Sequence, residues 1–595
     1  MKACKSDSEM KLKGIAVSSG IIIGKAYLVD RSKVKITYQY LVSQEQVSKE
    51  VKRLEDAIRT TREQLITIKN HMPENIKTHS FIIESHLMIL KDSMFADASI
   101  QRILNESINS EWAVQKSLEE IREIFKQIDD EYIRNRIEDV ENVAERVLRN
   151  LSGEDQKDLA GIDQRVIVVA HDLAPADTTE LNLEKVIGFI TDGGGRTSHT
   201  GIMAQALKLP AVVALETATD LIKNGDILIV DGNTGEVIIN PLEGTIAGYK
   251  KRQIQQEKFK SSIARTSHLP AETLDGYRIA IKANIEFLEE VESAREYGGE
   301  AIGLYRTEVL YIKSKTLPTE EELFEDYRQV AEIIAPDPVT IRTLDTGGDK
   351  IAAVAMETDD EMNPALGLRA IRFCLKEPEI FKTQLRSILR ASAYGKVQIM
   401  FPMISGLQEV LDARAILEQA RQELDTRQIA YDHDIKVGIM IEIPSAVSMA
   451  EVLARHVDFF SIGTNDLIQY ALAIDRINEH VAHIYEPFHP AISRMIQQVV
   501  AAARKAGINV SICGEMAGDP LCIPILLGLG LDELSMNARS IPFIKKIIRE
   551  ISMKDARLDF ENILKLSTAK EIRGYIINRM KALIPELEGK GYLYS

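Results

Sequence analysis

The chain has 595 residues, more than one hydrophobic core can organise, so its length predicts about two to four domains. Hydrophobic residues make up 45% and charged residues 27% of the sequence, and no apolar run is long enough for a membrane helix, which argues against insertion into a membrane. The net charge of -16 excludes a general affinity for nucleic acid or for an anionic membrane surface.

The cysteines and the N-terminal residues indicate the cellular compartment of the protein. The four cysteines (Cys4, Cys374, Cys513 and Cys522) lie far apart and lack CxxC spacing. This pattern excludes a disulfide scaffold or a zinc ribbon and favours a reducing compartment, so we expect a cytoplasmic protein. Residues 1–9 have the character of a loose tail, and translation could start at Met1 or at Met10. We expect no signal peptide, because Gly20 and Lys25 interrupt the apolar stretch.

The first patterned part of the chain changes from strand to helix near Tyr40. Residues 14–30 predict two short strands around a turn at Ser18-Ser19-Gly20. Apolar residues then follow helical spacing from Val47 to Met72, and Ser43 with Gln46 predicts a capping box at the start of that helix. Further helical patterns cover 82–90, 112–128 and 140–151.

Strand patterns return after Arg165. Buried runs at 166–169 and 186–190 precede a predicted hairpin, whose strands 227–230 and 237–239 flank the turn 231–235. We expect this segment to close on the N-terminal strands, so that the helical segment is an insertion between them. Residues 243–262 are highly charged and predict a linker helix. A cut near Tyr249 is expected to release the N-terminal half as a folded fragment.

The remainder of the chain has the most regular pattern. Strand-like runs begin near Ile279, Ala301, Val339, Val397, Val437, Phe459, Val510 and Leu534. Helical stretches separate most of these runs. A doubly wound sheet would also alternate in this way, but eight such units in this length favour a closed (β/α)8 barrel.

Polar residues gather where these strands are expected to end, which is where such barrels carry their active sites. The predicted ends hold Asn284, Arg306, Arg342, Met403, Glu442, Asn465, Asp466, Cys513 and Asn537. Glu442 and Asp466 follow consecutive strands, and their oxygens could share a hard cation such as Mg²⁺. The arginines suit a substrate with both phosphate and carboxylate, because guanidinium pairs with either group; they are Arg306 and Arg342, with Arg369 and Arg476 as further candidates. Any one of them alone could be a solvated loop charge.

A second candidate site is the glycine-rich segment 191–204, TDGGGRTSHTGIMA. Three glycines would let the backbone approach an anion, and Thr197 or Ser198 could cap a helix that starts beside His199. The helix dipole would keep the imidazole neutral and would then favour a negative group on the ring, as in a phosphohistidine. Taken alone, a histidine in a glycine-rich loop such as His199 is more often structural or a simple anion ligand. The spacing excludes a dinucleotide fingerprint and a P-loop.

Long strings in a fixed order carry a family resemblance. They are GGGRTSHTGIMAQALKLPAVV, YRTEVLY (305–311), IRTLDTGGDK (341–350), NPALGLRAIR (363–372), FPMIS (401–405), GIMIEIPSA (438–446), FFSIGTNDLIQY (459–470) and SICGEMAG (511–518). They resemble the phosphoenolpyruvate–protein phosphotransferases, the enzyme I family of the bacterial sugar phosphotransferase system. The resemblance covers nearly the whole chain, including the helical insertion.

The resemblance implies a multidomain α/β protein. After an N-terminal tail (1–9), a swivelling phosphohistidine domain takes 10–34 and 152–242, and a helical domain that binds the phosphocarrier HPr takes 35–151. A linker helix (243–266) then leads to a (β/α)8 barrel (267–595) that binds phosphoenolpyruvate and forms a homodimer. The implied reaction moves the phosphoryl group of phosphoenolpyruvate to a histidine of this chain and then to HPr, and releases pyruvate.

The resemblance also implies individual roles. His199 matches the phosphorylated residue, Cys513 the acid that protonates the enolpyruvate carbon, and Glu442 and Asp466 the Mg²⁺ ligands. The substrate clamp matches Arg306, Arg342, Asn465, Asp466 and Arg476, with Arg369 and Lys350 close by. We expect surrounding cations to bring the pKa of the Cys513 thiol near neutrality. The expected carrier-docking stretch, 79–92, contains only Glu84 and Asp92 as acids, which predicts weak complementarity to a basic carrier face.

Three competing interpretations were weighed against this one. A pyruvate, phosphate dikinase or a phosphoenolpyruvate synthase would need a nucleotide-binding domain where only the helical insertion lies. A catalytically silent relative would be expected to lose His199, Cys513 or a metal carboxylate, and all are present. A nitrogen-regulatory paralogue would carry a sensory domain ahead of Gly14, for which the preceding residues are too few.

Overall fold

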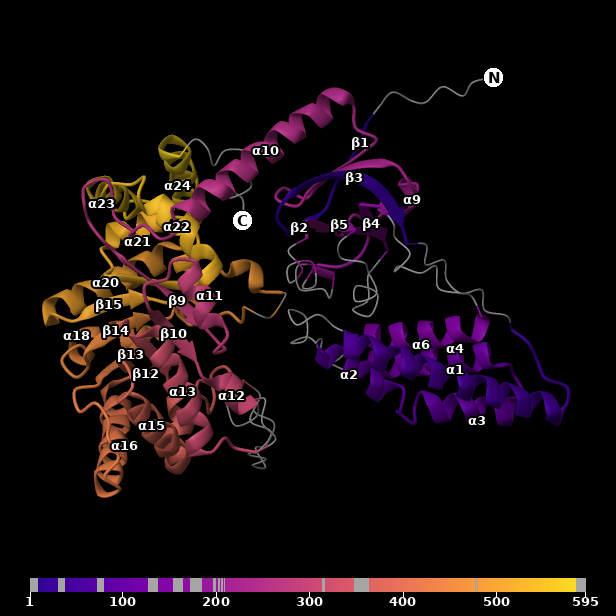
Figure 1. Ribbon diagram of the computed structural model, residues 1–595, viewed down its shortest axis with the longest axis horizontal. Coiled ribbons are helices and arrows are strands. Elements are labelled where there is room, and N and C mark those ends of the chain that lie inside the picture. Colours follow the sequence, from indigo (N-terminus) through magenta and orange to yellow (C-terminus); the bar gives the residue numbers. More distant parts are fainter. Residues whose placement is uncertain are drawn as a thin grey trace. The chain divides into compact units, whose positions relative to one another are not determined.

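The computed structural model divides into two units, Met1–Glu257 and Lys258–Leu593 (Figure 1). An eight-stranded sheet forms the core of the first unit, and a closed barrel forms the core of the second. The structure describes residues 9–29, 38–71, 80–126, 137–153, 164–171, 185–195, 200, 201, 204, 207, 209–312, 316–346, 363–476, 478 and 480–584. No helix among these residues is long and apolar enough to cross a bilayer.

The sheet of the first unit has the strand order β1-β8-β7-β3-β4-β5-β6-β2. Its strands are β1 (Met10–Lys13), β2 (Ile15–Ser18), β3 (Ile21–Leu28), β4 (Val166–Ala170), β5 (Val186–Thr191), β6 (Ala211–Val213), β7 (Ile227–Asp231) and β8 (Glu236–Ile239). The predicted hairpin is confirmed, because β7 and β8 pair antiparallel. The later strands close on the N-terminal ones as expected, since β3 pairs with both β4 and β7.

One strand of this sheet was not predicted. β1 lies ahead of the two predicted strands and pairs antiparallel with β8, from Met10 opposite Ile239 to Lys13 opposite Glu236. Its side chains are mostly exposed. The sequence MKLK is too short to predict a strand by itself. Its strand conformation depends on backbone pairing with β8 rather than on a buried face.

A helical cluster lies between β3 and β4 in the chain. Its helices are α1 (Gln44–His71), α2 (Ser80–Ile89), α3 (Ala96–Glu106), α4 (Ser110–Lys126) and α6 (Ile137–Ser152), with a short α9 (Ala218–Leu221) belonging to the sheet. The predicted capping box is confirmed: the Gln46 amide donates to Ser43 Oγ over 3.3 Å, and the Ser43 amide donates to Gln46 Oε1 over 3.2 Å. Helix α3 was missed, because its sequence has few apolar residues between polar ones.

The linker is a continuous helix, α10 (Glu243–Arg265), and its first half packs on the sheet (Figure 1). Tyr249 is buried with Ile21, Ile229 and Ile238, and its hydroxyl donates to Glu236 over 2.6 Å. Three residues further on, Arg252 pairs with the buried carboxylate of Asp231 at 2.9 Å. A cut near Tyr249 would therefore remove part of the first unit rather than separate it cleanly.

The second unit contains the predicted barrel, which is confirmed. Its parallel strands close in the order β10-β11-β12-β13-β14-β15-β16-β9. They are β9 (Ala280–Ile285), β10 (Ile302–Arg306), β11 (Val339–Arg342), β12 (Val397–Phe401), β13 (Lys436–Ile441), β14 (Phe459–Ile462), β15 (Asn509–Ile512) and β16 (Glu533–Asn537). Inside the barrel the ring of Phe459 takes the space that a side chain at Gly438 would occupy, since a Cβ there would lie 2.4 Å from the ring.

Helices between the strands cover the outside of the barrel (Figure 1). They are α11 (Glu290–Glu296), α12 (Glu308–Ile312), α13 (Glu320–Ile334), α14 (Ile371–Lys376), α15 (Pro378–Ala391), α16 (Leu407–Thr426), α17 (Pro444–Ser448), α18 (Ala450–Leu453), α19 (Thr464–Leu472), α20 (Pro490–Ala506), α21 (Ile523–Leu529), α22 (Ile541–Ile548), α23 (Met553–Ile563) and α24 (Ala569–Leu583). Their ends follow ordinary capping chemistry. Thr319 and Glu322 form a capping box at α13, and Gly507 ends α20 at a φ of +71°.

We predict that an N-terminal fragment ending at Glu257 is more stable than one ending at Gly248. The shorter fragment loses the buried ring of Tyr249 and the partner of the Asp231 carboxylate. Burial of an aromatic ring and a charged hydrogen bond together predict a loss of about 3 kcal/mol in the free energy of unfolding. Urea titration of both fragments measures this difference, and equal midpoints would show that the first half of α10 contributes nothing to the sheet.

Candidate functional site

The carboxyl ends of the barrel strands bring most of the predicted site residues to one edge. Strand register places Arg306 of β10 beside Arg342 of β11, and Arg342 beside Met400 of β12. On the other side of the closure, Asn537 of β16 pairs with Asn284 of β9. Parallel strands end at the same face, so the side chains that follow them converge there.

The guanidinium of Arg342 lies at the centre of a buried charge network. Arg342 is 8% exposed and pairs with Glu308 and with Asp345, whose Oδ2 lies 2.7 Å from Nη1. Asp345 also accepts from Arg369 at 2.9 Å, so one carboxylate joins two arginines. Burial alone would lower the pKa of Arg342, but the neighbouring carboxylates Asp345 and Glu308 outweigh that effect and raise it. Arg342 therefore stays charged in a site shielded from water.

Glu442 is the most buried carboxylate of this edge, with 1% of its surface exposed. Its Oε1 accepts from the amide of Met403 over 2.6 Å, and Met403 adopts a φ of +57°, a conformation uncommon for residues with a side chain. Burial raises the pKa of Glu442 well above its usual range, and the negative charges of Asp466 and Asp345 raise it further. The site thus holds a carboxylate that a nearby cation would stabilise in its charged form.

This arrangement fits a divalent metal ion. A Cβ at Gly463 would lie 2.7 Å from Glu442 Oε2, so the glycine leaves room for the carboxylate in this position. Within the described part of the chain, no group of three or more His, Cys, Asp and Glu side chains forms a complete ligand set. Two carboxylates with the remaining positions left for substrate and water are the usual arrangement for Mg²⁺, and Glu442 and Asp466 are the two carboxylates of this edge that would fit it.

Asn465, Asp466 and Arg476 lie on and after α19. The Asn465 side chain donates to Glu515 Oε1 over 3.1 Å and accepts from the Glu515 amide over 2.9 Å, so it is fixed in orientation. Arg476 Nη2 lies 3.9 Å from Asp466 Oδ1, a distance too long for a hydrogen bond but short enough for attraction. Arg306, whose side chain is 38% exposed, pairs with Glu286 at 2.6 Å. Arg306 and Arg476 therefore keep donors that face the solvent side of the site.

Cys513 lies inside the barrel mouth with 3% of its surface exposed. Its Sγ lies 3.6 Å from the carbonyl oxygen of Ile462, and Nδ2 of the Asn284 side chain donates to the Cys513 carbonyl over 2.9 Å. Burial raises the pKa of the thiol to about 11, against an interaction with the Ser461 side chain that lowers it; Glu442 also raises this pKa, while Arg342 and Arg306 lower it. The expectation of a pKa near neutrality is therefore wrong, because burial outweighs the two arginines. At neutral pH the thiol carries its proton.

His199 lies outside the described residues, as does Lys350. The described part of the glycine-rich segment is anchored to the sheet: the Gly193 amide donates to the His171 carbonyl over 2.9 Å, and Gly194 has a φ of +94°. The buried carboxylate of Asp192 accepts from the Thr219 amide over 3.2 Å and lies 3.6 Å from the ring of His171. The turn that leads to His199 is thus held by hydrogen bonds that do not involve His199.

In the helical cluster, the expected docking stretch offers little free negative charge. Glu84 pairs with Lys69 at 2.7 Å, and Asp92 accepts from the Met94 amide over 2.8 Å. His86 is buried 3.3 Å from Asp139. Met88, by contrast, is 69% exposed. The exposed described residues of this stretch are Glu84, Met88, Lys91 and Asp92, so its surface combines an apolar side chain with charges of both signs.

Sequence reasoning missed the acids that hold the arginines. Glu308 lies within the motif YRTEVLY and Asp345 within the motif IRTLDTGGDK, and neither acid was given a role of its own. The spacing of Asp345 three residues after Arg342 was the available signal. Glu515, the partner of Asn465, was missed for the same reason.

Comparison with known proteins gives matches along the whole chain. Family models for PEP-utilising enzymes match in three parts: the N-terminal model at residues 13–136, the mobile-domain model at 162–235 and the PEP-binding-domain model at 260–553. Enzymes of this kind generally depend on a metal ion.

Several relatives match over nearly their full length, and each is named phosphoenolpyruvate-protein phosphotransferase. Those of Geobacillus stearothermophilus and Bacillus subtilis (strain 168) are each 43% identical, covering 96% of this chain and 98% and 100% of the relatives. The protein of Haemophilus influenzae is 42% identical, covering 94% of this chain and 97% of its own length.

We predict that the Cys513 thiol ionises with a midpoint near pH 11 in the presence of EDTA, well above the ordinary value for cysteine. The pH dependence of its alkylation by iodoacetamide, followed by peptide mass spectrometry, measures that midpoint. A midpoint at or below about 8.5 would mean that the arginines outweigh burial after all.

Proposed function

The chain belongs to the phosphoenolpyruvate–protein phosphotransferase family, and on that premise we propose which of its residues perform each step. It transfers the phosphoryl group of phosphoenolpyruvate to protein, a reaction of the sugar phosphotransferase system. We propose that His199 is the first acceptor and that the phosphocarrier HPr receives the group from His199.

The observation that carries this proposal is the convergence of charge at the carboxyl end of the barrel. Arg342 and Arg369 are fixed by Asp345, while Arg306 and Arg476 remain half-exposed. Arginines fixed by buried carboxylates present their remaining N–H groups in one orientation, which suits the phosphate and carboxylate of a single small substrate. Asn465 and Asp466 complete the proposed substrate site.

In the proposed transfer, a ring nitrogen of His199 attacks the phosphorus in line and the bond from phosphorus to the enol oxygen breaks. The transition state is loose, so catalysis consists of positioning and of charge stabilisation by the arginines. Glu442 and Asp466 would hold Mg²⁺, which when bound supplies charge neutralisation at the phosphoryl oxygens. His199 belongs to a different unit from the barrel, so we propose that its domain moves between the donor and the carrier.

The enolate that remains needs a proton on carbon to become pyruvate. We propose that Cys513 donates it, because a thiol whose pKa is raised to about 11 by burial is protonated at neutral pH. The S–H bond breaks as the C–H bond forms, and the thiolate recovers its proton from solvent. The nearby Arg342 and Arg306, which lower that pKa, stabilise the transient thiolate.

Three further parts of the proposal concern partners and location. We propose that HPr docks on the helical cluster, with the exposed side chain of Met88 contributing an apolar contact. The barrel unit is proposed to form a homodimer. We also propose a cytoplasmic location, because Cys374, Cys513 and Cys522 are free thiols, and Cys513 must stay reduced to act as an acid.

The experiment that tests this function is incubation of the full chain with ³²P-labelled phosphoenolpyruvate, Mg²⁺ and HPr, with labelled ATP as the control donor. We expect label on this chain and on HPr from phosphoenolpyruvate, and none from ATP. Labelling from ATP alone would instead indicate a dikinase.

We predict that His199→Ala abolishes labelling of both this chain and HPr, since it removes the only proposed acceptor. The matched control is His171→Ala, which removes an exposed imidazole at the end of β4 and should leave labelling within about twofold of the parent. Acid-labile phosphate persisting on the His199→Ala chain would exclude His199 as the acceptor.

We predict that Glu442→Gln and Asp466→Asn each lower turnover by about a hundredfold or more at a fixed Mg²⁺ concentration, because each loses one charged oxygen ligand. Glu409→Gln is the control, since Glu409 caps α16 near the same edge and is given no role in catalysis. An Mg²⁺ dependence identical in the variants and the parent would identify Glu442 and Asp466 as structural carboxylates.

A further inference from the structure

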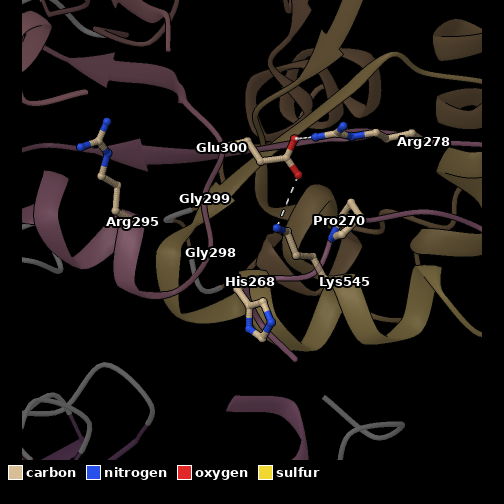
Figure 2. Close-up of a pocket in the computed structure, with 8 residues that line it drawn as sticks. All are labelled: His268, Pro270, Arg278, Arg295, Gly298, Gly299, Glu300 and Lys545. Atoms are coloured by element: carbon tan, nitrogen blue, oxygen red, sulfur yellow. Dashed lines mark hydrogen bonds and ion pairs between the residues drawn. The ribbon is translucent and has the colours of Figure 1, made fainter. Parts of the chain in front are cut away.

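A second charged cavity lies at the opposite end of the barrel from the proposed donor site (Figure 2). Its volume is about 400 Å³, and its walls come from segments that precede β9 and β10, together with α22. These are the amino ends of the strands, whereas Arg306 and Glu442 lie at or just after the carboxyl ends. The cavity is large enough for a small ligand and plays no part in the phosphotransfer proposed above.

Two cations share one carboxylate in this cavity. Glu300 lies 3.4 Å from Lys545 Nζ and 3.3 Å from Arg278 Nη2, and Figure 2 shows both side chains directed at it. The Lys545 side chain is only 2% exposed, whereas that of Arg278 is 65% exposed at the rim. Among the residues that line the cavity in the described part of the chain, Glu300 is the single carboxylate.

Other basic groups surround this pair. His268 lines the cavity beside Lys545, whereas the guanidinium of Arg295 points away from Glu300 and donates to the carbonyls of Ile334 and Ala335. Burial lowers the pKa of Lys545; Glu300 counteracts this effect, but Arg549 and Arg278 lower that pKa further. Positive charge therefore exceeds negative charge here, in a chain whose net charge is -16.

We propose that this cavity binds a small phosphate dianion, either inorganic phosphate or a phosphate monoester. Arg278 and Lys545 exceed Glu300 by one positive charge, with the ring of His268 beside them, and phosphate carries close to two negative charges at neutral pH. Guanidinium and ammonium groups are the usual side-chain partners of phosphate in proteins. A bound dianion would neutralise the buried ammonium of Lys545, which shares its carboxylate with Arg278.

The geometry of the wall links this site to the end of the linker helix. Gly298 has a φ of +86°, and a Cβ there would lie 2.2 Å from the Ser267 carbonyl oxygen, so the turn before β10 packs directly on the segment that follows α10. Arg549 donates from the same side to Thr266 Oγ1 over 3.0 Å. A dianion that bridges Arg278, Lys545 and His268 would tie this segment to α22 and slow its local opening.

The test is binding of inorganic phosphate and of glycerol 3-phosphate to the full chain, measured by calorimetry in the Arg306→Gln background to weaken anion binding at the donor site. Arg278→Gln is the test variant, because its exposed side chain can be removed without emptying the core. Arg455→Gln is the matched control, an exposed arginine that also precedes a barrel strand, β14.

We expect Arg278→Gln to weaken binding of both anions at least about fivefold, with Arg455→Gln unchanged. Hydrogen exchange of residues 266–270 should slow on addition of phosphate in the parent and not in Arg278→Gln. The anion that binds more tightly identifies the source, inorganic or esterified. Binding that is unaffected by Arg278→Gln, or exchange at 266–270 that does not respond to phosphate, would overturn the proposal.

Discussion

The guanidinium of Arg342 is buried between Glu308 and Asp345, and the rest of the barrel edge is arranged around that contact. A buried charge of this kind is tolerated only when it is paired, and loss of one partner typically costs about 3–5 kcal/mol. Asp345 extends the pairing to Arg369, and the buried carboxyl group of Glu442 forms no ion pair with a described basic side chain. The arginines of this edge are therefore held in place, whereas the carboxyl group of Glu442 is left without a basic partner among the described residues. Such an arrangement suits a site that binds a cation together with a phosphorylated acid.

The two units divide the proposed chemistry between them. The barrel carries fixed charge on strand ends, where a backbone held by eight parallel strands keeps side chains in place. The proposed acceptor, His199, follows a glycine turn anchored by Asp192 and by the carbonyl of His171. Helix α10 packs its first half on the sheet and its last turns, through Ile263, on the core of the barrel unit.

Much of this could be predicted from sequence because it depends on local pattern. The eight barrel strands, the hairpin of β7 and β8 and the Ser43–Gln46 capping box all follow from apolar period, turn residues or fixed spacing. Features that depend on partners distant in the chain could not be predicted. Strand β1 exists because β8 pairs with it, and the Glu308–Arg342 pair requires β10 and β11 to be neighbours. The direction of the Cys513 pKa shift was misjudged because the sequence names the nearby arginines but not the depth of burial.

The most direct test of the proposed donor site is the affinity of the full-length His199→Ala chain for phosphoenolpyruvate and Mg²⁺, measured by calorimetry with and without Arg342→Lys. The lysine keeps a charge for Glu308 and Asp345 but loses the paired N–H groups of guanidinium. We expect the His199→Ala chain to bind phosphoenolpyruvate, and the added Arg342→Lys to weaken that binding at least about tenfold in a chain whose thermal unfolding remains cooperative. Equal affinities in the two proteins would contradict the assignment of the barrel edge around Arg342 as the donor site.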